Sequence, residues 1–136
     1  MNLAKIMTPK ILTAHIHEND SVRQGLEKLR SHGFTAVPVL DTNERYLGAI
    51  TEGDFLRHII NIGSTDMHKL ESTRVGELFR RDFCPPLKIN SEREQVLEAV
   101  LQQNFVPIVD DRGCLCGIIT RRSVIKAVTE MLDKAE

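Results

Sequence analysis

The chain has 136 residues, of which 41% are apolar, and a formal net charge of −1 at neutral pH. This length and composition suit one domain of ordinary size with an aliphatic core. The near-neutral charge argues against a dedicated nucleic-acid-binding or membrane-surface protein. No apolar run approaches the roughly 18 residues that span a bilayer, and the N-terminus lacks the apolar core of a signal peptide. We therefore expect a cytoplasmic protein without a nucleic-acid or membrane partner.

The first predicted element is a short extended stretch at residues 11–16. A helix follows it, because Asn19, Asp20 and Ser21 are good caps and apolar residues then recur at helical spacing. Within residues 36–51, two apolar runs enclose an Asp-containing turn, which predicts a β-hairpin. A second helix begins after this hairpin.

The same order of elements recurs in the second half of the chain. An extended stretch at residues 87–89 leads to a helix after Asn90 and Ser91, and residues 105–120 predict another hairpin before the last helix. The hairpin segments AVPVLDTNERYLGAIT and FVPIVDDRGCLCGIIT align at an offset of 69 residues without a gap. Their matched pairs are Pro38 and Pro107, Asp41 and Asp110, Gly48 and Gly117, and Thr51 and Thr120.

The repeat predicts an α/β (α+β) fold built from tandem β-α-β-β-α units. We place the first unit at residues 1–62, a polar linker at 63–74 and the second unit at 75–136. Each unit, at about 60 residues, buries so little surface that it would be only marginally stable alone. We therefore expect the two to pair about a pseudo-twofold axis. The matched prolines are expected at strand edges, where no ladder N–H is needed.

The two helix starts that follow the hairpins differ in chemistry. Thr51 and Asp54 have the spacing of a capping box. In the second repeat Arg121 and Arg122 come first, and Ser123 replaces the aspartate. A cation at a helix N-terminus costs about 0.3–1 kcal/mol, whereas an anion is favoured there.

Arginine also binds phosphate bidentately, so Arg121 and Arg122 predict a phosphate site. The alternative is that one of them extends into solvent or forms an ion pair. The acidic candidates for such a pair are Asp110, Asp111 and Glu130.

Other chemistry has little support in the sequence. Cys84, Cys114 and Cys116 are too few for a disulfide framework and lack obvious partners for a metal site, so we expect free thiols. His15 and His17 share one strand face, and we interpret them in the same structural way. No nucleophile triad, phosphate-binding loop or HExxH motif occurs. We expect neither an enzyme nor a required cofactor or metal.

The ordered motifs resemble a CBS-domain pair, also called a Bateman module, over nearly the whole chain. They are Ile6-Met7-Thr8-Pro9, the segments 33–41 and 48–54, Val106–Asp110 and Gly117–Thr120. The resemblance implies a cytoplasmic regulatory module without catalytic activity. It also implies adenine-containing ligands in clefts between the repeats, and dimerisation through the helices into a flat disk. In this family the threonine contacts phosphate and the aspartate holds ribose, which implies those roles for Thr51 and Asp54.

A finer resemblance is to stand-alone bacterial CBS proteins that bind cyclic di-AMP. It rests on Ala14-His15, the segment 34–38, the inter-repeat segment and the segment 120–126. In that group the arginines contact phosphates, while the alanine and the aromatic–threonine pair hold an adenine. The implied contacts here are Ala14, Phe34, Thr35, Arg121 and Arg122. The lysine that precedes the alanine in that group has no match, since Leu12 or Thr13 stands there.

The predicted ligand-binding set combines both repeats. Thr35 and Ala36 offer backbone groups at a cleft wall, while Phe34 contacts an adenine or belongs to the core. The full set is Ala14, His15, Phe34, Thr35, Ala36, Pro38, Thr51, Asp54, Val106, Pro107, Thr120, Arg121, Arg122 and Ser123.

The predicted function is to sense an adenine nucleotide, cyclic di-AMP foremost, and to signal to a separate, unidentified target protein. One alternative is a module for AMP, ATP or S-adenosylmethionine. The other is a structural dimerisation protein whose clefts are vestigial.

Overall fold

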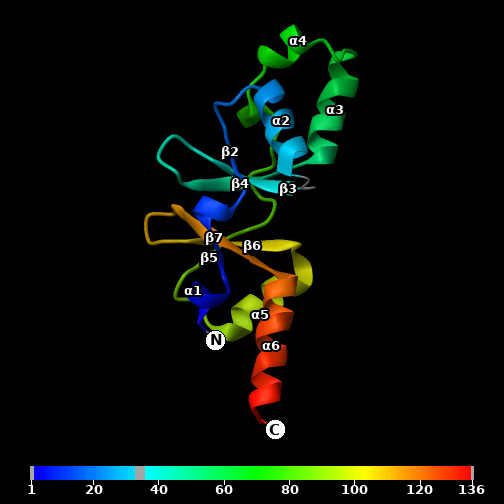
Figure 1. The fold of residues 1–136 in the computed structure, drawn as a ribbon. Coiled ribbons are helices and arrows are strands. Elements are labelled where there is room, and N and C mark those ends of the chain that lie inside the picture. The colour runs from blue at the N-terminus through cyan, green and yellow to red at the C-terminus, as the bar shows by residue number, and fades with distance from the viewer. Residues whose placement is uncertain (1, 33–35, 136) are drawn as a thin grey trace. The chain divides into compact units, whose positions relative to one another are not determined.

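The computed structural model describes residues 2–32 and 36–135, and the chain divides into two compact units (Figure 1). One unit, Ala14–Phe83, contains the first hairpin and is called the first-repeat unit. The other, Met1–Thr13 with Cys84–Glu136, contains the second hairpin and is called the second-repeat unit. Each combines a small sheet with helices, so the predicted α/β class is confirmed.

The first-repeat unit has a three-stranded sheet in the order β2-β3-β4. Its strands are β2 (Ile16–His17), β3 (Ala36–Leu40) and β4 (Tyr46–Thr51); its helices are α2 (Val22–His32), α3 (Glu52–Ile62), α4 (Met67–Glu71) and the 3-10 turn η2 (Val75–Glu77). Strand β2 is parallel to β3, and β3 forms the predicted antiparallel hairpin with β4. Buried Ile16, Ile50 and Phe55 lie in its core.

The second-repeat unit has a four-stranded sheet in the order β1-β7-β6-β5. Its strands are β1 (Thr8–Pro9), β5 (Leu87–Lys88), β6 (Phe105–Val109) and β7 (Leu115–Thr120); its helices are α1 (Leu3–Ile6), the 3-10 turn η1 (Lys10–Leu12), α5 (Arg93–Gln102) and α6 (Arg121–Ala135). Strand β6 is parallel to β5 and antiparallel to β7, which repeats the arrangement of the other unit.

The segment that precedes each repeat packs on the sheet of the other repeat. Thr8 and Pro9 of β1 pair with Ile118 and Gly117 of β7, and Leu3 is buried in the second core. In the first-repeat unit the equivalent contact is an isolated antiparallel β-bridge between Ala49 of β4 and Arg80, which precedes the second repeat's strands. The second-repeat unit therefore combines two separate stretches of sequence, whereas the first-repeat unit is one continuous stretch.

These crossings explain the matched glycines. A Cβ added at Gly117 would lie 2.2 Å from the carbonyl oxygen of Thr8, and one added at Gly48 would lie 2.5 Å from that of Arg80. Such distances leave no room for a side chain. Gly48 and Gly117 recur because another backbone segment crosses each hairpin at that residue.

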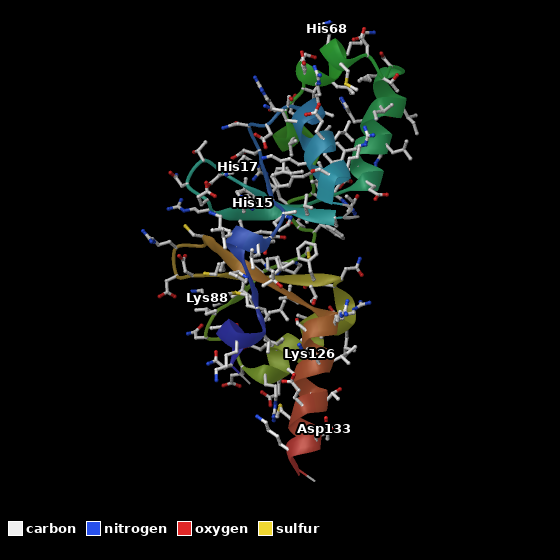
Figure 2. The ribbon with its side chains drawn as sticks, in the orientation of Figure 1. His15, His17, His68, Lys88, Lys126 and Asp133 are labelled. Atoms are coloured by element: carbon white, nitrogen blue, oxygen red, sulfur yellow. The ribbon has the colours of Figure 1, made fainter. Side chains whose placement is uncertain are left out.

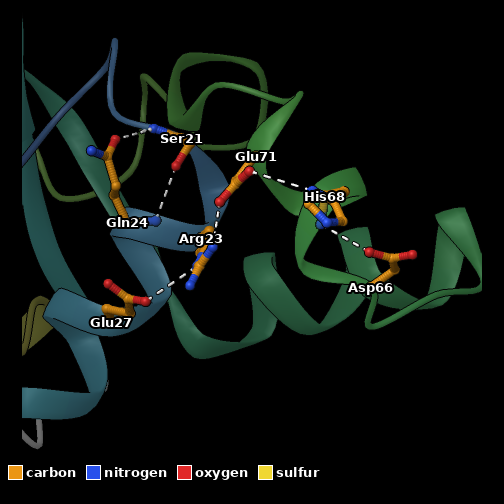
Figure 3. Close-up of polar contacts among 7 residues, drawn as sticks. All are labelled: Ser21, Arg23, Gln24, Glu27, Asp66, His68 and Glu71. Atoms are coloured by element: carbon orange, nitrogen blue, oxygen red, sulfur yellow. Dashed lines mark hydrogen bonds and ion pairs between the residues drawn. The ribbon is translucent and has the colours of Figure 1, made fainter.

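The inter-repeat segment is structured rather than an unattached linker. Its helix α4 buries Leu70, which is 2% exposed, in the first core. Figure 3 shows how the surface of α4 is tied to α2: Arg23 pairs with Glu71 and also with Glu27, at 3.3 Å for the second pair. His68 lies 3.9 Å from Glu71. The polar composition of residues 61–74 therefore reflects an exposed helix face.

The matched prolines lie in inner strands, not edge strands, because β3 and β6 have neighbours on both sides. Pairing of β3 with β2 begins at Val39, one residue after Pro38. Pairing of β6 with β5 likewise begins at Ile108, one residue after Pro107. The parallel ladders begin just beyond each proline, so its missing N–H is tolerated there.

Of the predicted helix caps, Ser21 is correct and the second-repeat candidates are wrong. The Gln24 N–H donates to Ser21 Oγ at 3.1 Å, and the Ser21 N–H donates to Gln24 Oε1 at 2.9 Å. Helix α5 instead starts after Glu92, whose N–H donates to Gln95 Oε1 at 2.9 Å. The reciprocal Glu–Gln spacing therefore outweighs the preceding Asn90 and Ser91.

The hairpin turns are held by their aspartates. Asp110 accepts backbone N–H bonds from Cys114 and Arg112, and the first of these contributes most to lowering the pKa of its carboxyl. In each turn one residue has left-handed backbone: Gly113 at φ 82° and, at the matched position, Glu44 at φ 65°. A glutamate in this conformation is unusual.

The three cysteines are free thiols, as predicted, and burial raises the pKa of Cys116. In the described part of the chain, no helix combines the length and the apolar character needed to cross a bilayer.

Candidate functional site

Several of the predicted ligand residues lie at the point where the second strand of each hairpin runs into a helix. In the first-repeat unit Ala36 pairs with Thr51, directly before α3. In the second-repeat unit Val106 pairs with Ile119, and Thr120 directly precedes α6. We call these two junctions the first-repeat site (Ala36, Thr51 and Asp54) and the second-repeat site (Thr120, Arg121, Arg122 and Ser123).

The first-repeat site contains the predicted capping box. Thr51 Oγ1 accepts the Asp54 N–H at 3.2 Å, and Asp54 Oδ2 accepts the Thr51 N–H at 2.9 Å. The Asp54 side chain is buried, and its other oxygen contacts two arginines, Arg57 Nη2 at 3.0 Å and Arg80 Nε at 3.4 Å. Three donors therefore already contact this buried carboxylate, and ribose hydroxyls would compete with them for it.

Sequence reasoning missed both arginine partners of Asp54. Arg57 lies one helical turn after the aspartate, so an i,i+3 charge search would have found it. Arg80 comes from the segment that crosses the hairpin, and its side chain also lies over the ring of Phe83, 4.2 Å from the centroid. No local pattern links Arg80 to Asp54, because they meet only through the tertiary fold.

The second-repeat site keeps the capping geometry without the charge. The Ser123 N–H donates to Thr120 Oγ1 at 3.2 Å, and the Thr120 N–H donates to Ser123 Oγ at 3.1 Å. The serine hydroxyl thus takes the place of the carboxylate of Asp54. The first turn of α6 contains no acidic residue, so nothing there neutralises the two arginines from within the turn.

Arg121 and Arg122 have different environments. Arg121 Nε donates to the carbonyl of Val100 at 2.6 Å, and its Nη2 lies 3.5 Å from that of Leu101. These carbonyls belong to the last turn of α5, where helical C=O groups lack partners and carry partial negative charge. Arg121 thus links two helices, a role that neither sequence alternative included. Arg122 is exposed, with no ion pair or hydrogen bond to any described residue.

The remaining predicted residues divide into core and surface positions. Val106, Pro107 and Pro38 are buried within strands, so only their backbone is placed to meet a ligand. Ala14 packs against the first core, and His15 lies beside His17, with ring centroids 5.6 Å apart (Figure 2). Two predicted contacts, at positions 34 and 35, lie outside the described residues.

Replacing Ser123 by aspartate is expected to stabilise the free protein by about 0.5 kcal/mol, because a carboxylate in the first helical turn complements the dipole and the adjacent arginines. Thermal unfolding at low ionic strength measures the gain, which should shrink as salt is added. A lower melting temperature for Ser123→Asp would show that the junction does not accept the first-repeat geometry.

Comparison with known proteins accounts for the repeat. The model of the CBS domain matches residues 3–61 and, a second time, residues 75–130. The chain belongs to the CBS domain family. The predicted resemblance to a CBS-domain pair is thus confirmed.

Known CBS proteins resemble the chain over most of its length. It is 30% identical over 117 residues to the Cyclic di-AMP receptor B of Bacillus subtilis (strain 168), covering 86% of this chain and 79% of the receptor. The crystal structure of the Listeria monocytogenes CbpB protein in complex with cyclic di-AMP has a TM-score of 0.83 and 26% identity, with 98% of both chains covered. A crystal structure of CBSX2 in complex with AMP has a TM-score of 0.76 and 26% identity, covering 96% of this chain and 97% of that one.

Enzymes also match, but the chain spans only 24% of the length of an acetyltransferase and 14% of a tRNA nucleotidyltransferase. These matches extend the family relationship and carry no activity over to this chain.

Proposed function

We propose that the chain is a cytoplasmic, non-enzymatic regulatory module that binds an adenine nucleotide, with cyclic di-AMP as its preferred ligand. The observation that carries this proposal is Arg122, an exposed cation at the N-terminus of a 15-residue helix, where an anion is the favourable partner. Sequence similarity to the cyclic di-AMP receptor of Bacillus subtilis supports the same ligand.

The contacts that Asp54 already makes within the protein favour cyclic di-AMP over AMP as the ligand. AMP presents two vicinal ribose hydroxyls, which suit a carboxylate with both oxygens available. The 3′,5′ linkage of cyclic di-AMP leaves only the 2′-hydroxyl of each ribose. Asp54 is already bound to Thr51 and two arginines, and Ser123 replaces the aspartate in the second repeat. A ligand with phosphodiesters and no vicinal hydroxyls matches these two sites better.

A thermal-shift panel tests the preference. Cyclic di-AMP, AMP, ADP, ATP and S-adenosylmethionine are each added to the purified protein at equal concentration. A ligand at 100 times its dissociation constant adds about 2.7 kcal/mol to the free energy of unfolding. We expect cyclic di-AMP to raise the melting temperature most. A larger shift with AMP would assign the site to mononucleotides, and no shift with any of them would indicate vestigial clefts.

We also propose that two copies associate through the apolar faces of α3 and α6. Leu56 and Ile60 on α3 are 58% and 67% exposed, and Ile125 and Leu132 on α6 are 65% and 64% exposed. In each helix these residues share one face. Each unit thus exposes an apolar helix face of the kind that marks a protein–protein contact, and a second copy of the chain is the proposed partner.

The double variant Ile60→Glu/Ile125→Glu is expected to be a monomer where the parent is a dimer, since each glutamate would be buried without a partner. Sedimentation equilibrium measures the difference. Leu101→Glu is the matched control, because Leu101 is 80% exposed on α5, outside the proposed interface. A dimer that persists in the double variant would exclude these helices as the interface.

We propose that the module signals to a separate target protein. That target must have different affinities for the ligand-bound and ligand-free forms, because only differential binding shifts an equilibrium.

A further inference from the structure

Three potential metal ligands converge on the surface of the first-repeat unit. His15, His17 and Glu44 each offer one ligand atom, and these atoms all lie within 4.8 Å of one another. His17 Nε2 is 3.0 Å from Glu44 Oε1. Figure 2 shows the two histidines next to each other. All three residues are half-buried, so an ion there would remain accessible to solvent.

Local structure explains how these side chains meet. Ile16, between the histidines, is 1% exposed and belongs to the first core, while His17 of β2 and His15, which directly precedes this strand, place their rings beside each other. Glu44 comes from the β3–β4 turn, where its N–H donates to the Asp41 carbonyl at 3.1 Å. A short strand with the residue before it and a tight turn therefore hold the set.

The second repeat provides an internal comparison. Ile16 pairs with Val39 and Leu87 pairs with Ile108, so the two short strands occupy equivalent places. The second-repeat equivalents of His15, His17 and Glu44 are thus Pro86, Lys88 and Gly113. The general fold of the repeat needs none of the three ligand types.

The backbone of Glu44 strengthens this contrast. Its φ of 65° is left-handed, and the second repeat has Gly113 at φ 82° in the same turn position. Glycine adopts this conformation at no steric cost, whereas a residue with a Cβ is strained there. The first repeat accepts this strain and thereby places a carboxylate against a histidine.

We propose that His15, His17 and Glu44 bind a divalent transition-metal ion of the zinc class. Two imidazoles and one carboxylate form a donor set that suits Zn²⁺, Ni²⁺ or Cu²⁺. With metal–ligand bonds of about 2.0–2.1 Å, tetrahedral ligand atoms lie roughly 3.4 Å apart, so modest side-chain rotation closes the set. Water completes the coordination. Both histidines bind as neutral imidazoles, and the ion replaces the direct His17–Glu44 contact.

Calorimetric titration of Zn²⁺ into nucleotide-free protein tests the site. The absence of nucleotide matters because His15 also belongs to the predicted ligand-binding set. The parent carries Cys114→Ser and Cys116→Ser, so that thiols do not compete for the ion. We expect one equivalent to bind with a dissociation constant in the micromolar range or below. Stoichiometric Co²⁺ should give visible d–d absorption, an independent signature of coordination.

The variants His17→Gln and Glu44→Gly should each weaken Zn²⁺ binding at least tenfold and remove the Co²⁺ bands. Glu44→Gly restores the second-repeat residue, so it should melt no lower than the parent, which separates loss of the site from loss of the fold. His68→Gln, at a side chain 92% exposed and outside the cluster, should bind like the parent. Equal affinity in the parent and both site variants, or no binding below millimolar Zn²⁺, would overturn the proposal.

Discussion

Gly117→Ala is expected to lower the free energy of unfolding by about 3 kcal/mol, at the upper end of typical overpacking costs. The new Cβ would lie 2.2 Å from the Thr8 carbonyl oxygen, 2.7 Å from Met7 Cγ and 2.9 Å from Met7 Sδ. The methionine can rotate away, but the carbonyl is backbone in the strand that pairs with β7. Relief of the clash therefore requires the N-terminal segment to move off the sheet. Urea unfolding measures the change, provided that the slope with denaturant stays constant.

Gly53→Ala is the matched control. The nearest atom to a Cβ at Gly53 is Thr51 Oγ1 at 3.6 Å, an ordinary contact, and the residue lies in α3. Alanine is favoured over glycine in a helix by up to about 1 kcal/mol, so this variant should be at least as stable as the parent. If Gly117→Ala changed stability by less than about 0.5 kcal/mol, within the range typical of unremarkable surface substitutions, the N-terminal segment would not cross β7 as described.

Arg122→Met is expected to weaken cyclic di-AMP binding by roughly 10- to 100-fold, the equivalent of one lost charged hydrogen bond. The melting temperature of the free protein should stay the same or rise, because a cation leaves the positive end of α6. Calorimetric titration and thermal unfolding measure the two effects. Arg112→Met removes an equal charge from the exposed β6–β7 turn and should leave the affinity within about threefold, about 0.65 kcal/mol.

Arg121→Met is expected to behave differently. Because Arg121 donates to the carbonyls at the end of α5, its loss should destabilise the free protein by about 1–2 kcal/mol. From the sequence we predicted a phosphate site for the pair, or else exposure to solvent or an ion pair for one arginine, and the contact of Arg121 with the α5 carbonyls belongs to neither interpretation. A destabilised Arg122→Met, or one that binds cyclic di-AMP like the parent, would reject the phosphate role of Arg122.

The fold was predictable because the chain contains two copies of one sequence pattern, so each copy could be checked against the other. Matched pairs such as Gly48 and Gly117 defined the hairpins, and Thr51 and Thr120 defined the helix starts. The reason for the glycines was not predictable, since the segments that cross them are distant in sequence and have no periodic signal. Helix α4 was missed for a related reason: it is five residues long and buries only Leu70.

The candidate site was predictable in its local parts only. Thr51–Asp54 and Thr120–Ser123 are contacts within one helical turn, which spacing reveals. Arg57 lies at i,i+3 from Asp54 and was open to a local search, but the contact of Asp54 with Arg80 and that of Arg121 with α5 depend on tertiary packing, which no local pattern indicates. His15 and His17 were visible as a pair, but Glu44 joins them through a turn of unusual backbone, which spacing does not encode.

Isothermal titration of the purified protein with cyclic di-AMP tests the central claim most directly. We predict saturable binding with a dissociation constant in the micromolar range or below, tighter than that of AMP or ATP under the same conditions. Affinity should fall as salt rises, because phosphate contacts to Arg122 are screened. No heat of binding up to millimolar cyclic di-AMP, with AMP or ATP binding instead, would contradict the account.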